Sequence, residues 1–201
     1  MRPSILSNME IIYRHFDSLP STNDWAKIHL ETLSRAALTV ITAVTQTQGR
    51  GRYGKRWISP AGENLYATFV FFTPTQDPVQ ITHLLALSTS ELLQEKDITA
   101  QIKWPNDLLV NRKKIAGILC ETVADQGIAI GIGLNVNMPI ESLALIDQPA
   151  TSILCETGAI QEIHPLLCTI TERFSTDLML YLEKGFAPFA SRFQARLIRS
   201  T

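Results

Sequence analysis

Strand-like segments fill the middle of this sequence. Residues 38–44 (LTVITAV) and 64–73 (NLYATFVFFT) are apolar runs rich in β-branched and aromatic residues, which is typical of buried strands. Residues 114–123 and 127–137 predict a hairpin of two long strands with its turn near residues 125–126. Weaker patterns predict an edge strand over residues 11–16, a short strand ending near Lys103, and another over residues 108–111.

Helix-like segments flank and interrupt these strands. Ser21 or Thr22 can cap a first helix, whose apolar positions are expected to be Trp25, Ile28 or His29, and Leu33. A second helix begins at Asp77, where an N-cap aspartate is followed by Pro78 and by Gln80 at the capping-box position, and it runs to about Glu95.

A third helix is predicted from Ile163 onward and has one long apolar stripe. The stripe consists of Leu166, Leu167, Ile170, Phe174, Leu178, and Tyr181 or Leu182, and Gly185 is suited to end the helix. A last short helix is expected over residues 188–198.

This order of elements predicts an α+β fold. We expect a mixed, largely antiparallel β-sheet with helices packed on one face. The 201 residues contain no internal repeat and no low-complexity linker, so residues 1–201 are expected to form a single domain.

Composition narrows the class of protein. Hydrophobic residues make up 45% of the chain and charged residues 18%, which supports a sizeable core and argues against disorder. The net charge of -1 does not indicate a bulk nucleic-acid binder or a membrane-surface protein. Three widely spaced cysteines offer neither a disulfide framework nor a metal site. Without a signal peptide or a membrane span in the sequence, we expect a cytoplasmic protein.

A glycine- and arginine-rich segment over residues 46–57, QTQGRGRYGKRW, follows one of the central strands. Its glycines let backbone amides approach a ligand closely. Four cations lie within seven positions, namely Arg50, Arg52, Lys55 and Arg56. Their mutual repulsion predicts a loop that is mobile when empty and ordered around a small anion such as phosphate. The alternative is a solvated basic surface loop. Trp57 and the strand that follows argue against it, because they tie the loop to the core.

Three further segments combine glycine with polar side chains. KWPND (residues 103–107) places a lysine at a strand end before a turn, although a simple surface corner would look the same. RKKIAGILCE (residues 112–121) has a glycine inside a strand, which marks either a close approach by ligand or backbone, or helix–sheet packing. GIGLNVN (residues 131–137) lacks the third glycine and the helix of a dinucleotide fingerprint, so its glycines are interpreted as the floor of a pocket.

Together these segments carry a family resemblance. In order, Ser21-Thr22-Asn23, Gln46 with GRGRYG and Trp57, NLY at residues 64–66, KWPND, RKKIAGILCE and GIGLNVN closely resemble the catalytic domain of biotin protein ligases. EKGFAPFASRF (residues 183–193) is also similar, so the resemblance extends over nearly the whole chain from about residue 11. It implies the fold shared by class II aminoacyl-tRNA synthetases and biotin ligases.

The resemblance also implies an activity and its site residues. A ligase of this family makes biotinyl-AMP from biotin and ATP with Mg2+, and then biotinylates one lysine of a carrier protein. Lys103 and Arg52 would be catalytic. Biotin would contact Ser21, Thr22, Asn23, Gln46, Arg50, Gly51, Arg52, Lys103, Gly117, Gly131 and Gly133. ATP or the adenylate would contact Arg50, Arg52, Trp57, Lys103, Asn106, Lys114 and Asn135. No metal site made by protein ligands alone is expected.

Partners and departures from the family follow from the same resemblance. The expected acceptor is the biotin carboxyl carrier protein of acetyl-CoA carboxylase, and a homodimer is possible because dimers are common in the family. About ten residues precede the first strand and the chain stops at Thr201. We therefore expect neither the N-terminal helix-turn-helix nor the C-terminal β-barrel of some members, and no nucleic-acid or membrane partner.

Two rival functions remain open at this point. A lipoate or octanoate ligase or transferase of the same superfamily would share the fold, but would be expected to carry a different arginine–glycine loop. A non-catalytic biotin-binding regulator would have no need for the lysine of KWPND.

Overall fold

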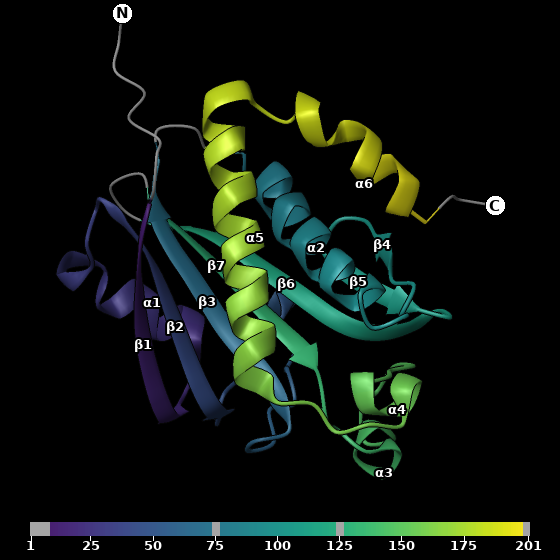
Figure 1. The fold of residues 1–201 in the computed structure, drawn as a ribbon. Helices are drawn as coiled ribbons and strands as arrows, with labels where there is room; N and C mark the ends of the chain where they lie inside the picture. Colours follow the sequence, from purple (N-terminus) through teal and green to yellow (C-terminus); the bar gives the residue numbers. More distant parts are fainter. Residues whose placement is uncertain (1–8, 74–76, 124–126, 199–201) are drawn as a thin grey trace, which may run out of the picture.

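A seven-stranded β-sheet forms the centre of the computed structural model, which describes residues 9–73, 77–123 and 127–198. The strands lie in the order β1-β2-β3-β7-β6-β5-β4 (Figure 1). Only β1 and β2 pair in parallel, and every other neighbouring pair is antiparallel. The predicted mixed, largely antiparallel sheet is therefore confirmed. The strands are β1 (Glu10–Leu19), β2 (Ala37–Gln46), β3 (Asn64–Phe72), β4 (Gln101–Lys103), β5 (Asp107–Val110), β6 (Lys113–Val123) and β7 (Gly127–Asn135).

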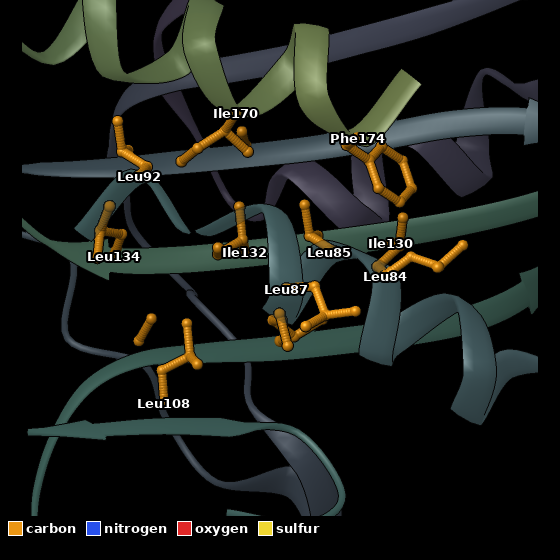
Figure 2. Packing of buried hydrophobic residues seen from close by; sticks show 14 of the residues in the cluster. Leu84, Leu85, Leu87, Leu92, Leu108, Ile130, Ile132, Leu134, Ile170 and Phe174 are labelled. Carbon is orange, nitrogen blue, oxygen red and sulfur yellow. The ribbon is translucent and has the colours of Figure 1, made fainter. Parts of the chain in front are cut away.

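The two long helices cover one face of this sheet. These are α2 (Pro78–Gln94) and α5 (Ile163–Lys184), and the shorter α6 (Ala190–Arg196) lies beside α2 (Figure 1). Figure 2 shows their side chains meeting those of β7, with Ile170 and Phe174 above Ile130 and Ile132. The Phe174 ring lies 5.2 Å from that of Phe69. Each such buried side chain stabilises the fold by roughly 1.5–3 kcal/mol, so this face forms a rigid base.

The opposite face carries the short helix α1 (Thr22–Ile28). Alternation along the strands separates the two faces, because successive side chains point to opposite sides. Val40, Phe69 and Ile130 pack with α2 and α5, whereas their neighbours Ile41, Val70 and Ala129 pack with the segment around α1. The helices are thus not confined to one face: the long ones are, and α1 lies across the sheet from them.

Local signals fixed the ends of several elements as predicted. The Asp77 side chain accepts hydrogen bonds from the backbone N–H groups of Val79 and Gln80, and Ser21 caps α1 by accepting from Asp24. α5 ends at Gly185, whose φ of 67° few other residues adopt. The helix expected over residues 188–198 is a 3-10 turn (Ala187–Phe189) followed by α6.

Other local predictions need adjustment. α1 ends at Ile28, whose side chain is exposed, and His29 instead stacks on Trp25 at 4.2 Å. A 3-10 turn (Leu30–Thr32) then carries the chain to buried Leu33. The turn predicted at residues 125–126 lies outside the described residues.

The remaining elements are short. They are the 3-10 turn Arg52–Gly54 and the helices α3 (Ile140–Leu143) and α4 (Ile153–Thr157). Among the helices described, none is both long enough and apolar enough to cross a membrane.

Candidate functional site

The predicted site residues gather on the α1 face of the sheet. Three glycines mark the place: Gly117 of β6 lies directly opposite Gly133 of β7 in the strand register, and Gly131 follows at the two-residue spacing that keeps it on the same face. These glycines lie on the surface of the sheet between α1 and the loop of residues 46–57. The rigid face with α2 and α5 lies behind them.

Protein side chains fill the space above these glycines. A Cβ on Gly133 would lie 2.3 Å from the indole of Trp57, and one on Gly117 would lie 2.9 Å from the same indole. A Cβ on Gly131 would lie 2.3 Å from Asn23 Oδ1. For Gly117, the close neighbours are the side chains of Trp57 and Lys114, and not backbone or a helix. The expected close approach of a ligand at this glycine stays a prediction. The glycines leave room for the side chains of Trp57 and Asn23. These two side chains and the three glycines together form the floor of the pocket.

A small inner cavity of about 50 Å³ lies over this floor. Its lining residues are Ser21, Thr22, Asn23, Gln46, Arg50, Gly51, Arg52, Trp57, Asn106, Lys114, Gly117, Ile118, Leu119, Gly131, Ile132 and Gly133. Neutral hydrogen-bonding side chains line the end of this cavity beside α1, namely Ser21, Thr22, Asn23 and Gln46. Gln46 Oε1 accepts from the backbone N–H of Thr22 at 2.9 Å, and Thr68 Oγ1 lies 2.6 Å from Asn23 Oδ1. A polar, neutral and pre-bonded end of this kind suits a ligand that offers donors and acceptors together.

A larger outer cavity of about 570 Å³ adjoins the inner one. The two share Gly51, Arg52, Trp57, Asn106 and Lys114, which we call the junction. Cations and exposed aromatic rings surround the outer cavity, including Lys55, Arg56, Lys103, Tyr53 and Trp104. Asn135 also lines it, although its amide donates to the carbonyl of Thr151. This cavity suits a large polyanion.

The two lysines of interest lie in different places. Lys114 is at the junction, with Nζ 2.7 Å from Asp107 Oδ1 and 5.3 Å from the centre of the Trp57 ring. Lys103 is exposed at the end of β4 and lines only the outer cavity. Lys103 is therefore not among the residues that line the inner cavity. The β-hairpin geometry explains this, because β5 and β6 carry Lys114 across the sheet toward Trp57 while β4 ends at the rim. The expected contact of Lys103 with the biotin carboxylate and the α-phosphate stays a prediction.

The two arginines of the loop also differ. Arg50 donates from Nε and Nη2 to both carboxylate oxygens of Asp24, at 2.9 and 2.6 Å, and from Nη2 to Glu121 at 3.0 Å. Arg52 instead donates to the neutral oxygens of Asn106 (3.2 Å) and Tyr53 (3.0 Å). The expected mutual repulsion of the loop cations is thus relieved on one side by protein carboxylates.

Charge compensation shifts the pKa of these groups. Burial alone would raise the pKa of Glu121, but hydrogen bonds from Asn23 and Lys27 and the charge of Arg50 outweigh it and lower the pKa. The same balance lowers the pKa of Asp24, where burial is outweighed by Lys27 and Arg50. Both carboxylates are therefore ionised at neutral pH.

A comparison with protein families decides what kind of domain this is. The model of the biotin/lipoate A/B protein ligase family matches residues 15–137, which is more than half of the chain. The chain belongs to this family.

Individual relatives of the ligase family agree. The bifunctional ligase/repressor BirA of Bacillus subtilis is 34% identical over 165 residues, covering 75% of this chain and 49% of its own. The biotin–[acetyl-CoA-carboxylase] ligase of Paracoccus denitrificans is 31% identical over 174 residues, covering 79% of this chain and 70% of its own. This chain thus spans about half the length of BirA.

Solved structures of ligases in the family share the fold. The biotin protein ligase from Aquifex aeolicus in complex with biotin and ATP is 31% identical, with a TM-score of 0.82 over 93% of this chain and 78% of that one.

Among the described residues, no group of three or more His, Cys, Asp or Glu side chains could hold a metal ion.

Several site residues of this family member were not predicted from its sequence. Glu121, Asp24 and Lys27 form the charged wall beside Arg50, Thr68 orients Asn23, and Asp107 pairs with Lys114. Glu121 could have been found, because it lies four residues after Gly117 on the same face of a strand. Asp24 looked like an ordinary acidic residue in a first helical turn, and Thr68 carries no sequence signal beyond its strand.

Proposed function

We propose that this chain activates biotin with ATP to form biotinyl-AMP and then transfers the biotinyl group to a lysine of a carrier protein. The observation that carries the proposal is the junction. There Lys114 and Arg52 stand between a small cavity with a neutral polar end and a large cavity surrounded by cations. A molecule with a polar ring at one end and a carboxylate at the other would lie with its carboxylate beside these two cations.

The first half-reaction would take place at the junction. A carboxylate oxygen of biotin attacks the α-phosphorus of ATP, the bond to the bridging oxygen breaks, and pyrophosphate leaves into the outer cavity. Like-charge repulsion is the main obstacle, so fixed cations that face the reacting oxygens lower the barrier. We assign this role to Lys114 and Arg52, and we assign Lys103 and Asn106 to the phosphates nearer the cavity mouth. Trp57, whose buried indole N–H has no acceptor within the described ranges, can donate to a ligand there.

We expect the inner cavity to enlarge when biotin binds. About 50 Å³ holds only a few water molecules, which is less than a bicyclic ring requires. Parts of the loop of residues 46–57, including Trp57, line this cavity. We expect the loop to move aside as biotin enters and then to close over it. The earlier expectation of a loop that becomes ordered around its ligand therefore stays a prediction.

Mg2+ would enter with ATP. Mg2+ is usually held by phosphate oxygens with one or two carboxylates, and Asp107 and Asp147 are carboxylates that line the outer cavity. It would neutralise phosphate charge there. In the second half-reaction, the neutral amine of the acceptor lysine attacks the acyl carbon, AMP leaves, and the amine loses a proton.

The acceptor that we propose is the biotin carboxyl carrier protein of acetyl-CoA carboxylase, supported by the name of the Paracoccus denitrificans relative. The proposal treats residues 1–201 as one catalytic domain that acts in the cytoplasm, with a homodimer as a possible assembly and no nucleic-acid partner.

The test is incubation with ATP, Mg2+, biotin and a carrier fragment, followed by intact-mass measurement. We expect the carrier to gain one biotinyl group, and a reaction with lipoate in place of biotin to leave it unchanged. Gain of lipoate alone would favour the lipoate ligases of the same family. Binding of biotin without any adenylate would indicate a regulator, and retention of specific DNA in a gel shift would indicate a repressor.

A further inference from the structure

Arg50 lies inside a charge-balanced cluster formed by three separate segments. Asp24 and Lys27 belong to α1, Arg50 to the loop, and Glu121 to β6. Lys27 Nζ lies 3.0 Å from Asp24 and 2.9 Å from Glu121, and Arg50 contacts the same two carboxylates. The side chains are only 23–35% exposed, so the pairs are partly shielded from water. With two cations and two carboxylates, the cluster has no net charge left for a ligand.

Glu121 connects this cluster to the inner cavity. Its Oε2 accepts from Nδ2 of Asn23 at 2.8 Å, and Asn23 also donates to the carbonyl of Leu119. Asn23 and Leu119 both line the inner cavity. One carboxylate thus orients a wall residue of the inner cavity and holds the loop at the same time.

The loop beyond Arg50 leads directly to the junction. Its base is closed by the hydrogen bonds Gly51 N to Lys55 O (2.7 Å) and Trp57 N to Gly49 O (2.9 Å). Arg52 follows two residues after Arg50, and its described hydrogen-bond partners are both neutral. Fixing Arg50 therefore sets the position of Gly51 and presents Arg52, with its charge uncompensated by a described carboxylate, toward the cavities.

We propose that Glu121 and Asp24 are positioning residues, which hold the loop over the cavities through Arg50, and that Arg50 is an anchor and not a phosphate ligand. The proposal rests on the proposed function, in which the loop closes over biotin. It assigns the two arginines of GRGR different tasks: the first fixes the loop and the second meets the anion. The bidentate contact of Arg50 with Asp24 suits a planar guanidinium and not an ammonium group.

The first experiment compares Glu121→Gln with the wild type. In ATP–pyrophosphate exchange, we expect the KM for biotin to rise roughly tenfold, which equals about 1.4 kcal/mol, while kcat changes less than about twofold. Saturating biotin restores the closed loop, so the loss falls on KM. Glu95→Gln is the matched control, because this exposed carboxylate pairs with Arg173 away from the cavities. An unchanged KM in Glu121→Gln, or an equal change in the control, would overturn the proposal.

The second experiment separates an anchor from a phosphate ligand. If Arg50 acts through Glu121 and Asp24, then Arg50→Gln and Glu121→Gln are strongly non-additive, and the double variant is little worse than Arg50→Gln alone. Arg50→Lys should rescue poorly, because lysine cannot form the bidentate contact. Additive effects, a large rise in the KM for ATP, or full rescue by lysine would show that Arg50 binds the phosphate directly.

The third experiment needs no activity. Hydrogen exchange of residues 49–57 in the unliganded protein should be several-fold faster in Glu121→Gln and Arg50→Gln than in the wild type and the control. Equal exchange in all four proteins would show that Arg50 does not anchor the loop, whatever the enzyme assays give. Conversely, faster exchange in a wild-type-folded protein that makes no biotinyl-AMP would retain the anchor and refute the proposed function.

Discussion

The inner and outer cavities meet at the junction but are built on different principles. At the end of the inner cavity beside α1, polar groups are already bonded to one another: Gln46 to Thr22, and Asn23 to Thr68 and Glu121. Around the outer cavity, cations such as Lys103 and Lys55 are exposed. A pre-bonded wall rejects a ligand that cannot match its donors and acceptors, whereas exposed cations attract any polyanion. Selectivity is therefore expected to come from the inner cavity and charge neutralisation from the outer one.

The largest effect is expected where the two cavities meet. Lys114→Met should lower the rate of biotinyl-AMP formation by about two to four orders of magnitude, on the scale of a lost oxyanion donor. Lys103→Met should mainly raise the KM for ATP by roughly tenfold, because this lysine lines only the outer cavity. Both variants should keep the wild-type fold by circular dichroism, and pyrophosphate exchange gives the rates.

The reverse order would contradict this division. If Lys103→Met abolished adenylation and Lys114→Met only weakened ATP binding, the lysine of KWPND would be the catalytic one, as the sequence resemblance alone had implied. The outer cavity would then have to close over the junction during the reaction.

The middle-sized effect concerns the floor of the inner cavity. In Gly133→Ala, the new methyl group would overlap the Trp57 indole, with contacts of 2.3–2.6 Å, and the ring would have to leave its seat. We expect a loss of about 1–3 kcal/mol in the free energy of unfolding, as for an overpacked core. Gly51→Ala at the junction is the control, because its methyl group would find only ordinary contacts at 3.5 Å and beyond.

Urea unfolding of the two alanine variants tests this difference. Equal stability in both would mean that Trp57 moves freely and does not fix the inner cavity. The inner and outer cavities would then differ only in the charge of the residues that line them.

Much of the fold could be predicted from the sequence because its signals are local. Asp77 and Pro78 indicate the start of α2, and the apolar stripe that includes Ile170 and Phe174 indicates the buried side of α5. The same signals cannot state which face of the sheet a short helix joins. Each strand offers two alternating sets of side chains, one on each face of the sheet, and a short helix can pack against either set. In this fold α1 packs against the set on the face opposite the long helices.

The site was predictable as a group of segments but not as a set of contacts. Glycine and arginine in GRGRYG indicated an anion-binding loop, yet nothing local distinguishes Arg50 from Arg52. The difference arises from Asp24 and Glu121, which are distant in sequence and reach the loop only after β6 and α1 have folded. Likewise, Gly131 and Gly133 indicated the floor of a pocket, but nothing in GIGLNVN predicts that Asn23 and Trp57 lie against these two glycines.

The smallest effect distinguishes the two cavities by pH. The pKa values of Asp24 and Glu121 are lowered in the folded protein, below ordinary values of 3.8 and 4.5, because Lys27 and Arg50 outweigh the effect of burial. A carboxylate with a lowered pKa stabilises the fold above its unfolded pKa, and this contribution is lost as the pH falls through the folded pKa. Glu121→Gln should therefore cost about 1 kcal/mol at pH 7, and less as the pH falls below about 4.

Lys103→Met provides the contrast from the outer cavity. Lys103 forms no ion pair with a carboxylate of the described residues, so any change in stability from Lys103→Met should be the same at pH 7 and at about pH 3.5. Urea unfolding of both variants and the wild type at several pH values measures the two differences. A Glu121→Gln effect that does not shrink in acid would mean that the wall of the inner cavity is held by shape and hydrogen bonds alone, and that its charges contribute nothing to closing the loop.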